Sequence, residues 1–107
     1  MVLLLALFSL EASAGTNIFV LKNQLEITTS VVSTEAISSD IRRNYLFIQN
    51  KGLTTVYISV GSASVGTDGL AVVAGGAYEY PIAPKASVYL KAAAGAPIVY
   101  LAEGIEP

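Results

Sequence analysis

From residue 18 onward, the chain alternates apolar and polar residues with a period of two. In the segment 25–32, Leu25, Ile27 and Val31 share one face, while Glu26 and Thr28 share the other. This period is typical of a β-strand that is buried on one face only. The same alternation, or a short apolar run, predicts further strands at residues 18–21, 44–50, 55–61, 70–73, 77–80, 87–91 and 98–102.

Residues that favour turns separate these segments. Lys22-Asn-Gln24 is expected to close the first strand, and the polar stretch 33–43 to form a crossing loop or a helical turn. Asn50-Lys-Gly52 predicts a hairpin between the strands on its two sides, and Gly75-Gly76 predicts a second, tight hairpin. Seven or eight short strands at this spacing predict an all-β domain over residues 18–107, an antiparallel β-sandwich or a jelly-roll-like barrel.

The first fourteen residues differ from the rest of the chain. An apolar run from Met1 to Leu10 precedes Ala12-Ser-Ala14, which fits a signal-peptide cleavage pattern, but no Lys or Arg precedes the run. The run is too short to span a bilayer, which takes about 20 residues. Two interpretations stay open: an apolar N-terminal arm over residues 1–17 that docks the subunit on its neighbours, and a signal peptide over residues 1–14. For the arm, the candidate contact residues are Leu3, Leu4, Leu7 and Phe8.

The composition describes a small domain with few charges. The chain has 107 residues, of which 53% are hydrophobic and 13% are charged, about half the usual charged share of ~25%. So few charges cover little of the surface of a domain this small. We therefore expect a subunit of a homo-oligomer or a larger assembly; the alternative is a monomer with a surface rich in Ala, Gly, Ser and Thr. The net charge of −2 argues against a nucleic-acid partner, because such binding depends on neutralising phosphates.

The sequence offers few groups for catalysis. It contains no Cys and no His, which excludes a disulfide framework, a thiolate nucleophile and Cys-based metal sites, and removes the commonest general base. The carboxylates are scattered and form no motif with metal-ligand spacing; Asp68 is expected to make a turn, and Glu79 and Glu103 to lie on exposed strand faces. We expect neither an enzyme nor a cofactor. The enzyme alternative needs Glu79 and Glu103 to meet in one pocket.

Arg42-Arg43 is the one adjacent pair of cationic side chains. A guanidinium group can clamp a phosphate or a carboxylate. Because the pair stands directly before a predicted strand, an exposed strand entry or an ion pair between subunits is the favoured interpretation.

Tyrosine is the dominant aromatic residue, with six copies and no Trp. Three of these residues, Tyr45, Tyr57 and Tyr89, fall opposite the aliphatic positions of their predicted strands. We expect them on the outer face of a sheet, where an apolar ring with a polar tip suits a protein interface, packing between neighbouring strands or sugar stacking. They are the candidate interface residues of the β domain.

Five segments of the chain resemble a family of small virion proteins of tailed bacteriophages. In that family an R-x-Y-L-x-I-Q-N strand leads to I-Y-V-x-x-G, to G-x-x-L-x-x-G-G-x-Y/W-E and to a final pair of strands. The matching segments here are Arg43–Asn50, Val56–Ser62, Gly69–Glu79, Val88–Lys91 and Ile98–Gly104. The resemblance implies a β-sandwich structural subunit of the virion, such as a capsid decoration (cement) protein or a head or tail component. It carries no catalytic residues, and the apolar start of the chain is not part of it.

The expected function is therefore adhesion between virion proteins, with capsid or other virion proteins as partners. The alternative is an exported carbohydrate- or receptor-binding module at the cell surface, for which residues 1–14 would be a cleaved signal peptide. The mass of the purified protein distinguishes the two, since the second predicts a start at Gly15.

Overall fold

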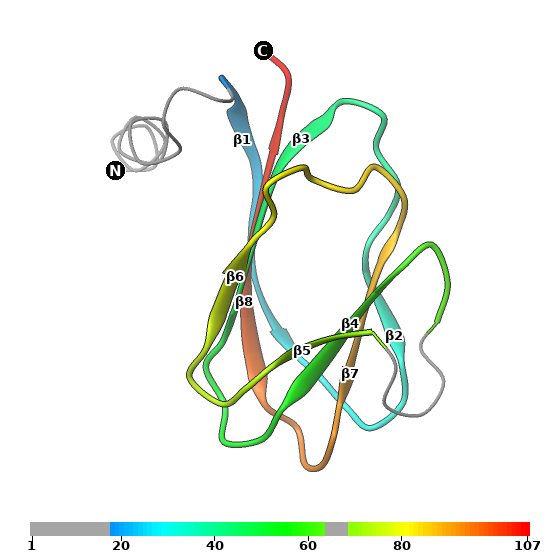
Figure 1. Ribbon diagram of the computed structural model, residues 1–107, viewed down its shortest axis with the longest axis vertical. Helices are drawn as coiled ribbons and strands as arrows, with labels where there is room; N and C mark the ends of the chain where they lie inside the picture. Colours follow the sequence, from blue (N-terminus) through cyan, green and yellow to red (C-terminus); the bar gives the residue numbers. More distant parts are fainter. Residues whose placement is uncertain (1–17, 64–68) are drawn as a thin grey trace.

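The structure, a computed structural model, describes residues 18–63 and 69–107, and within them all regular secondary structure is β-strand. The eight strands form two antiparallel sheets of four (Figure 1). Sheet A has the strand order β1-β8-β3-β6 and sheet B the order β2-β7-β4-β5. The strands are β1 (Val20–Thr28), β2 (Thr34–Ile37), β3 (Arg43–Asn50), β4 (Val56–Val60), β5 (Leu70–Val72), β6 (Ala77–Glu79), β7 (Val88–Ala92) and β8 (Ile98–Ile105).

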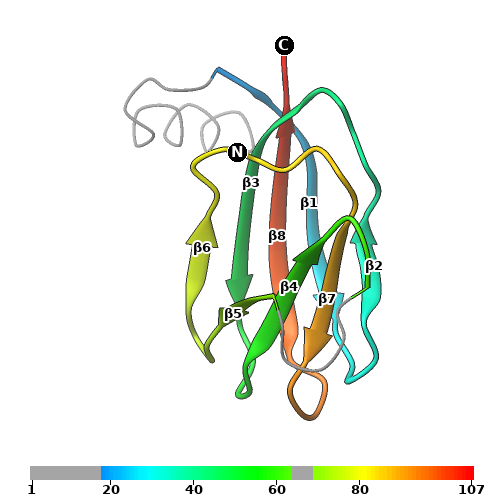
Figure 2. The same cartoon turned by 45° about the vertical axis from the view of Figure 1, so that its right-hand side comes forward.

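The strands pair from the two ends of the chain inward, first with last, as in a ribbon that is folded in half and rolled up. β1 pairs with β8, β2 with β7, β3 with β6 and β4 with β5, all antiparallel. Two further pairings, β3 with β8 and β4 with β7, close the roll into two facing sheets (Figure 2). Eight strands connected in this way form a jelly roll. The predicted all-β sandwich is thus confirmed.

The core lies between the two sheets. Its fully buried side chains come from the alternate, inward-facing positions of the long strands, as the period of two predicts. The large aliphatic residues exposed by no more than 2% are Leu46, Ile48, Val56, Ile58, Val88, Leu90, Val99 and Leu101.

Both predicted hairpins are wrong. β3 and β4 belong to different sheets, so the loop 51–55 crosses the sandwich instead of turning back within one sheet. The loop 73–76 likewise connects β5 of sheet B to β6 of sheet A. Gly75, with φ of 76°, does make the expected turn. Turn residues specify where a chain reverses, but the sheet that the next strand joins depends on the rolled topology.

Three other local predictions are also wrong. Residues 22–24 do not end a strand, because β1 continues through them and absorbs Lys22 as a bulge between Leu21 and Asn23. β1 then ends at Thr28, which leaves Val31, expected on a buried face, 52% exposed in the following loop. The polar stretch 33–43 contains β2, which pairs with β7.

The sandwich has two ends of different composition. Loops 29–33, 51–55, 73–76 and 93–97 gather at one end, the lower end in Figure 1. We call these four loops the low-charge end. The opposite end carries the connections 38–42 and 80–87 and the C-terminus.

Candidate functional site

The low-charge end combines few charges with exposed apolar side chains from several loops. Lys51 is the only charged residue within its four loops, and the Lys51 ammonium group already pairs with the Glu26 carboxylate at 2.5 Å. At the opposite end, the segments 38–42, 80–87 and 106–107 contain four charged residues: Asp40, Arg42, Lys85 and Glu106. The two ends of one small domain therefore differ sharply in charge.

Large apolar side chains project from each of the four loops or from the strand next to it. Leu53 is 94% exposed, Val32 67% and Val73 63%, and Val31 and Ile98 are about half exposed. A shallow hollow of about 400 Å³ opens between the loops 51–55 and 93–97. Clustered apolar side chains of this kind on a soluble surface are typical of an interaction site.

The buried side chain of Asn50 fixes the conformation of the low-charge end. The Asn50 side chain is fully buried, and its amide nitrogen donates to the carbonyls of Thr54 (2.7 Å) and Val72 (3.0 Å). The amide oxygen of Asn50 accepts a hydrogen bond from the Gly52 N–H at 3.0 Å. One amide thus fixes the loop 51–55 against the neighbouring strand β5.

Hydrogen bonds also connect the loops to one another. The Thr29 hydroxyl donates to the Pro97 carbonyl at 2.7 Å, and the Thr54 hydroxyl donates to the Ala94 carbonyl at 2.7 Å. Gly52 lies so close to Pro97 that a Cβ atom on Gly52 would stand 2.2 Å from the Pro97 Cβ. A surface tied in this way loses little conformational entropy on binding.

The opposite end is organised around the buried ion pair of Arg43 and Glu103. The Arg43 Nε lies 2.7 Å from the Glu103 Oε2, and the two side chains are 0% and 1% exposed. The remaining guanidinium N–H groups donate to the carbonyls of Pro84, Ala86 and Ser38. Arg43 therefore clamps a carboxylate, but an internal one, and the expectation of an exposed strand entry or an intersubunit pair is wrong for this residue.

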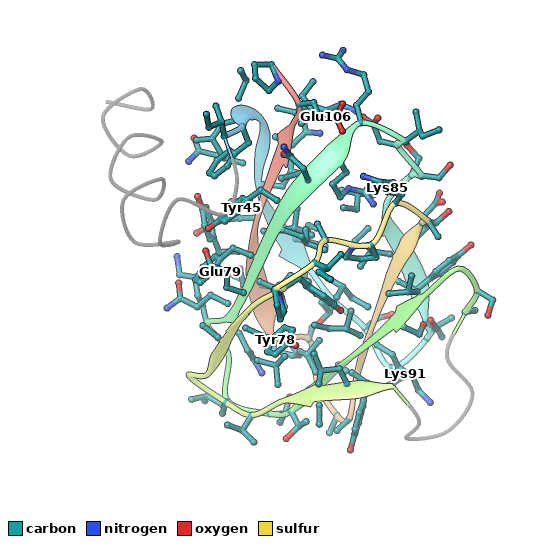
Figure 3. All side chains as sticks on the ribbon, turned by 45° about the horizontal axis from the view of Figure 1, so that its top comes forward. Tyr45, Tyr78, Glu79, Lys85, Lys91 and Glu106 are labelled. Atoms are coloured by element: carbon teal, nitrogen blue, oxygen red, sulfur yellow. The ribbon has the colours of Figure 1, made fainter. Side chains whose placement is uncertain are left out.

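Glu103 and Glu79 do not meet. Glu103 stands opposite Leu46 and so faces the core, which contradicts its expected place on an exposed strand face. Glu79 is exposed, stands opposite Phe47 and lies on the outer face of sheet A; Figure 3 shows it directed away from the sandwich, whereas Tyr78 points between the sheets. The pocket with two carboxylates that the enzyme alternative needs is not formed by this pair.

Asp40 is held by two hydrogen bonds at the charged end. Lys22 donates to Asp40 at 2.6 Å, and this bond, together with the Arg42 backbone N–H, holds the pKa of Asp40 below its ordinary value. Among residues 18–63 and 69–107, no group of three or more acidic side chains gathers as a metal site would require. These ranges also contain no helix with the length and apolar character needed to cross a bilayer. Asp68 lies outside the described residues.

The three candidate tyrosines lie on outer sheet faces, but on opposite sides of the molecule. Tyr57 and Tyr89 alternate with core residues of sheet B and are half-buried. Tyr45 belongs to sheet A and is only 8% exposed, because the ring of Phe19 stacks on it at a centroid distance of 4.2 Å. The three residues therefore form no single patch. The arm candidates Leu3, Leu4, Leu7 and Phe8 lie outside the described residues.

The aromatic residues around Tyr45 were not predicted from the sequence as a candidate site. Phe19, Phe47 and Tyr100 join it in a second apolar cluster on the outer face of sheet A, in which Phe47 and Tyr100 pack edge to face. The alternation of β3 and β8 placed Phe47 and Tyr100 on that face. What the sequence did not reveal is that β3 and β8 are neighbours.

No protein-family model matches the chain, and comparisons with curated proteins and with solved structures gave no match.

Proposed function

We propose that this chain is a structural subunit of a bacteriophage virion, a capsid decoration (cement) protein or a head- or tail-associated subunit, and that it adheres through its low-charge end. The observation that supports the proposal is the contrast between this end, with one paired charge and exposed Leu53, Val32 and Val73, and the charged opposite end.

The low-charge end has the properties of a binding surface. Burying it requires almost no desolvation of charge, which is the main cost at polar surfaces. Its hydrogen-bonded loops are already ordered. Jelly rolls occur in viral capsid and lectin domains among others, so the fold is compatible with this function, although a fold alone does not define one.

The proposal is tested on purified particles of the bacteriophage whose genome encodes this chain. We expect the protein to co-purify with assembled particles and to be identified there by mass spectrometry. Leu53→Asp and Val32→Asp should each leave the fold intact, because both side chains are exposed, and should reduce particle binding at least about tenfold, since a charge would be buried in the contact.

Ile82→Asp is the matched control. Ile82 is 86% exposed and lies in the segment 80–87 at the charged end, so this variant should bind particles like the wild type. Absence of the protein from particles, or equal binding by the Leu53 and Ile82 variants, would contradict the proposal.

An exported carbohydrate- or receptor-binding module is the second candidate. Phe47 and Tyr100 on the outer face of sheet A support it, because half-buried aromatic rings beside polar side chains suit sugar stacking. The Gln24 amide bonds to the Tyr100 hydroxyl at 3.0 Å, which places such a polar group beside the rings. Binding to a glycan array that Phe47→Ala abolishes, with a mature start at Gly15, would favour this function.

A further inference from the structure

We propose that two copies of this chain pair through the open edge of β1, with the strands antiparallel around a two-fold axis at Gln24. The dimer would join the two copies of sheet A into one continuous sheet of eight strands. Three properties of β1 support this pairing: the length of its edge, the direction of its backbone groups and the order of its charges.

Among the described strands, β1 is the only long one at a sheet edge. The edges of the two sheets are β1 and β6 in sheet A and β2 and β5 in sheet B. β1 has nine residues, whereas β2 has four and β5 and β6 have three each. A long edge strand with unpaired backbone groups is a template for pairing with another strand.

Beyond the bulge at Lys22, residues 24–28 of β1 present a regular row of hydrogen-bonding groups on the open side of the strand. The Thr29 N–H donates to the Pro97 carbonyl, so Thr29 faces β8. Residues alternate in direction along an antiparallel strand, and no bulge interrupts residues 24–28. The N–H and C=O groups of Gln24, Glu26 and Thr28 therefore point away from β8. Within the described part of the chain, no backbone hydrogen bond outside the ladders involves these three residues.

The charges of β1 are self-complementary in the antiparallel orientation. Lys22 and Glu26 are the two charged residues of the strand and stand two residues to either side of Gln24. A two-fold axis at Gln24 brings Lys22 of each copy, at its bulge, next to Glu26 of the other. A parallel pairing would instead bring like charges together, which is unfavourable across strands.

The side chains of Lys22 and Glu26 are each accessible to a second partner. Lys22 is paired with Asp40 and Glu26 with Lys51, but the Lys22 and Glu26 side chains remain 40% and 57% exposed. Adding the partner copy would extend each pair into a network of alternating charge. Such networks contribute more than isolated exposed pairs.

The dimer also suggests how the proposed adhesion would work. This step alone depends on the proposed function. Because the paired strands run in opposite directions, the low-charge ends of the two copies point to opposite ends of the dimer. Each end can then contact a different neighbour, so the dimer is a bivalent link between two virion subunits. Simultaneous engagement of two sites raises the overall affinity well above that of one.

The test measures the mass of the purified full-length protein in solution, in the absence of particles, by light scattering and sedimentation. We expect a dimer for the wild type. Lys22→Glu makes the β1 edge wholly acidic and Glu26→Lys makes it wholly basic, so each variant alone should dimerise at least about tenfold more weakly. A mixture of the two variants should form a heterodimer, since the acidic edge of one variant would then face the basic edge of the other at both charged positions.

Two further variants separate this interface from effects on folding. Gln24→Pro removes one outward N–H at a position where an edge strand tolerates proline, and should give a folded monomer by circular dichroism. Glu79→Lys makes the same charge change as Glu26→Lys on the other edge of sheet A and should remain dimeric. A monomeric wild type, or a mixture that does not associate, would overturn the dimer. A dimer that is absent from particles would contradict only the proposed function.

Discussion

Arg43 and Glu103 form an ion pair at 2.7 Å in a region where neither side chain is exposed by more than 1%. The second Glu103 oxygen accepts from the Asn23 amide at 2.7 Å, so both carboxylate oxygens have partners. Through its bonds to the carbonyls of Pro84 and Ala86, Arg43 also holds the segment 80–87 against sheet A. A single guanidinium group thus links three parts of the chain at the charged end.

Glu103→Gln should destabilise the protein by about 3–5 kcal/mol, because it leaves the Arg43 charge buried without a counter-charge. Chemical denaturation at neutral pH measures the change, and Glu79→Gln on the exposed outer face is the control, with an expected effect within about 0.5 kcal/mol. Replacing both partners, as in Arg43→Met with Glu103→Leu, should not restore the stability, because the carbonyls of Pro84, Ala86 and Ser38 would lose their donor. A loss below about 1 kcal/mol for Glu103→Gln would show that the pair contributes little.

Gly104→Ala tests the close packing of the outer aromatic cluster. A Cβ atom at Gly104 would stand 2.5 Å from the Phe19 Cδ1 and 3.0 Å from the Tyr45 Cβ. We expect a loss of stability of about 1–3 kcal/mol from this overlap. In a Phe19→Ala background only the 3.0 Å approach to the Tyr45 Cβ remains, so the same substitution should cost less there. A double-mutant cycle measures the difference, and equal effects in both backgrounds would argue against the Phe19 contact.

The sequence predicted the strands that are long and regular, together with their faces. β3 is an example, because the alternation of Leu46 and Ile48 with Tyr45 and Phe47 reports directly which residues enter the core. It did not predict partners for these strands. The turn residues around Gly52 and Gly75 specify local reversals, whereas strand pairing in a jelly roll joins segments that lie far apart along the chain.

Because strand partners could not be predicted, the sequence also did not reveal the buried ion pair at one end of the sandwich or the low-charge surface at the other. Arg43 stands 60 residues from Glu103 in the sequence, and charged residues are rarely buried unless paired, so exposure was the natural prediction for each taken alone. The four loops of the low-charge end are visibly poor in charge in the sequence. Only the topology shows that they meet on one surface.

Asn50→Ala should loosen the low-charge end as well as reduce stability. It removes the partners of the Thr54 and Val72 carbonyls and of the Gly52 N–H, and each buried group left unpaired costs about 1–3 kcal/mol. Asn50→Asp should cost more, because a carboxylate would face two carbonyl oxygens. Hydrogen exchange should show faster exchange at Gly52, with Gln49→Ala on the outer face as the control. Unchanged exchange in both Asn50 variants would exclude the role assigned to this amide.

Asp40 should make stability depend on pH on the acidic side. The hydrogen bond from Lys22 is the largest cause of its lowered pKa, and the bond from the Arg42 N–H is the second. A carboxyl group whose pKa is lower in the folded than in the unfolded state stabilises the fold above its ordinary pKa of 3.8. This stabilisation is lost as the pH falls through the lowered pKa of the folded state.

Melting temperatures of the wild type and Asp40→Asn across about pH 2–7 test this dependence. The wild type should be the more stable at neutral pH, and the difference should shrink below about pH 4 as Asp40 becomes protonated. Added salt should reduce the difference, since both side chains of the Lys22 pair reach solvent. In a Lys22→Met background the pH-dependent difference should be smaller but not zero, because the Arg42 N–H still bonds to the carboxylate. A difference that is independent of pH in the wild-type background would mean that the ionised form of Asp40 contributes nothing to folding.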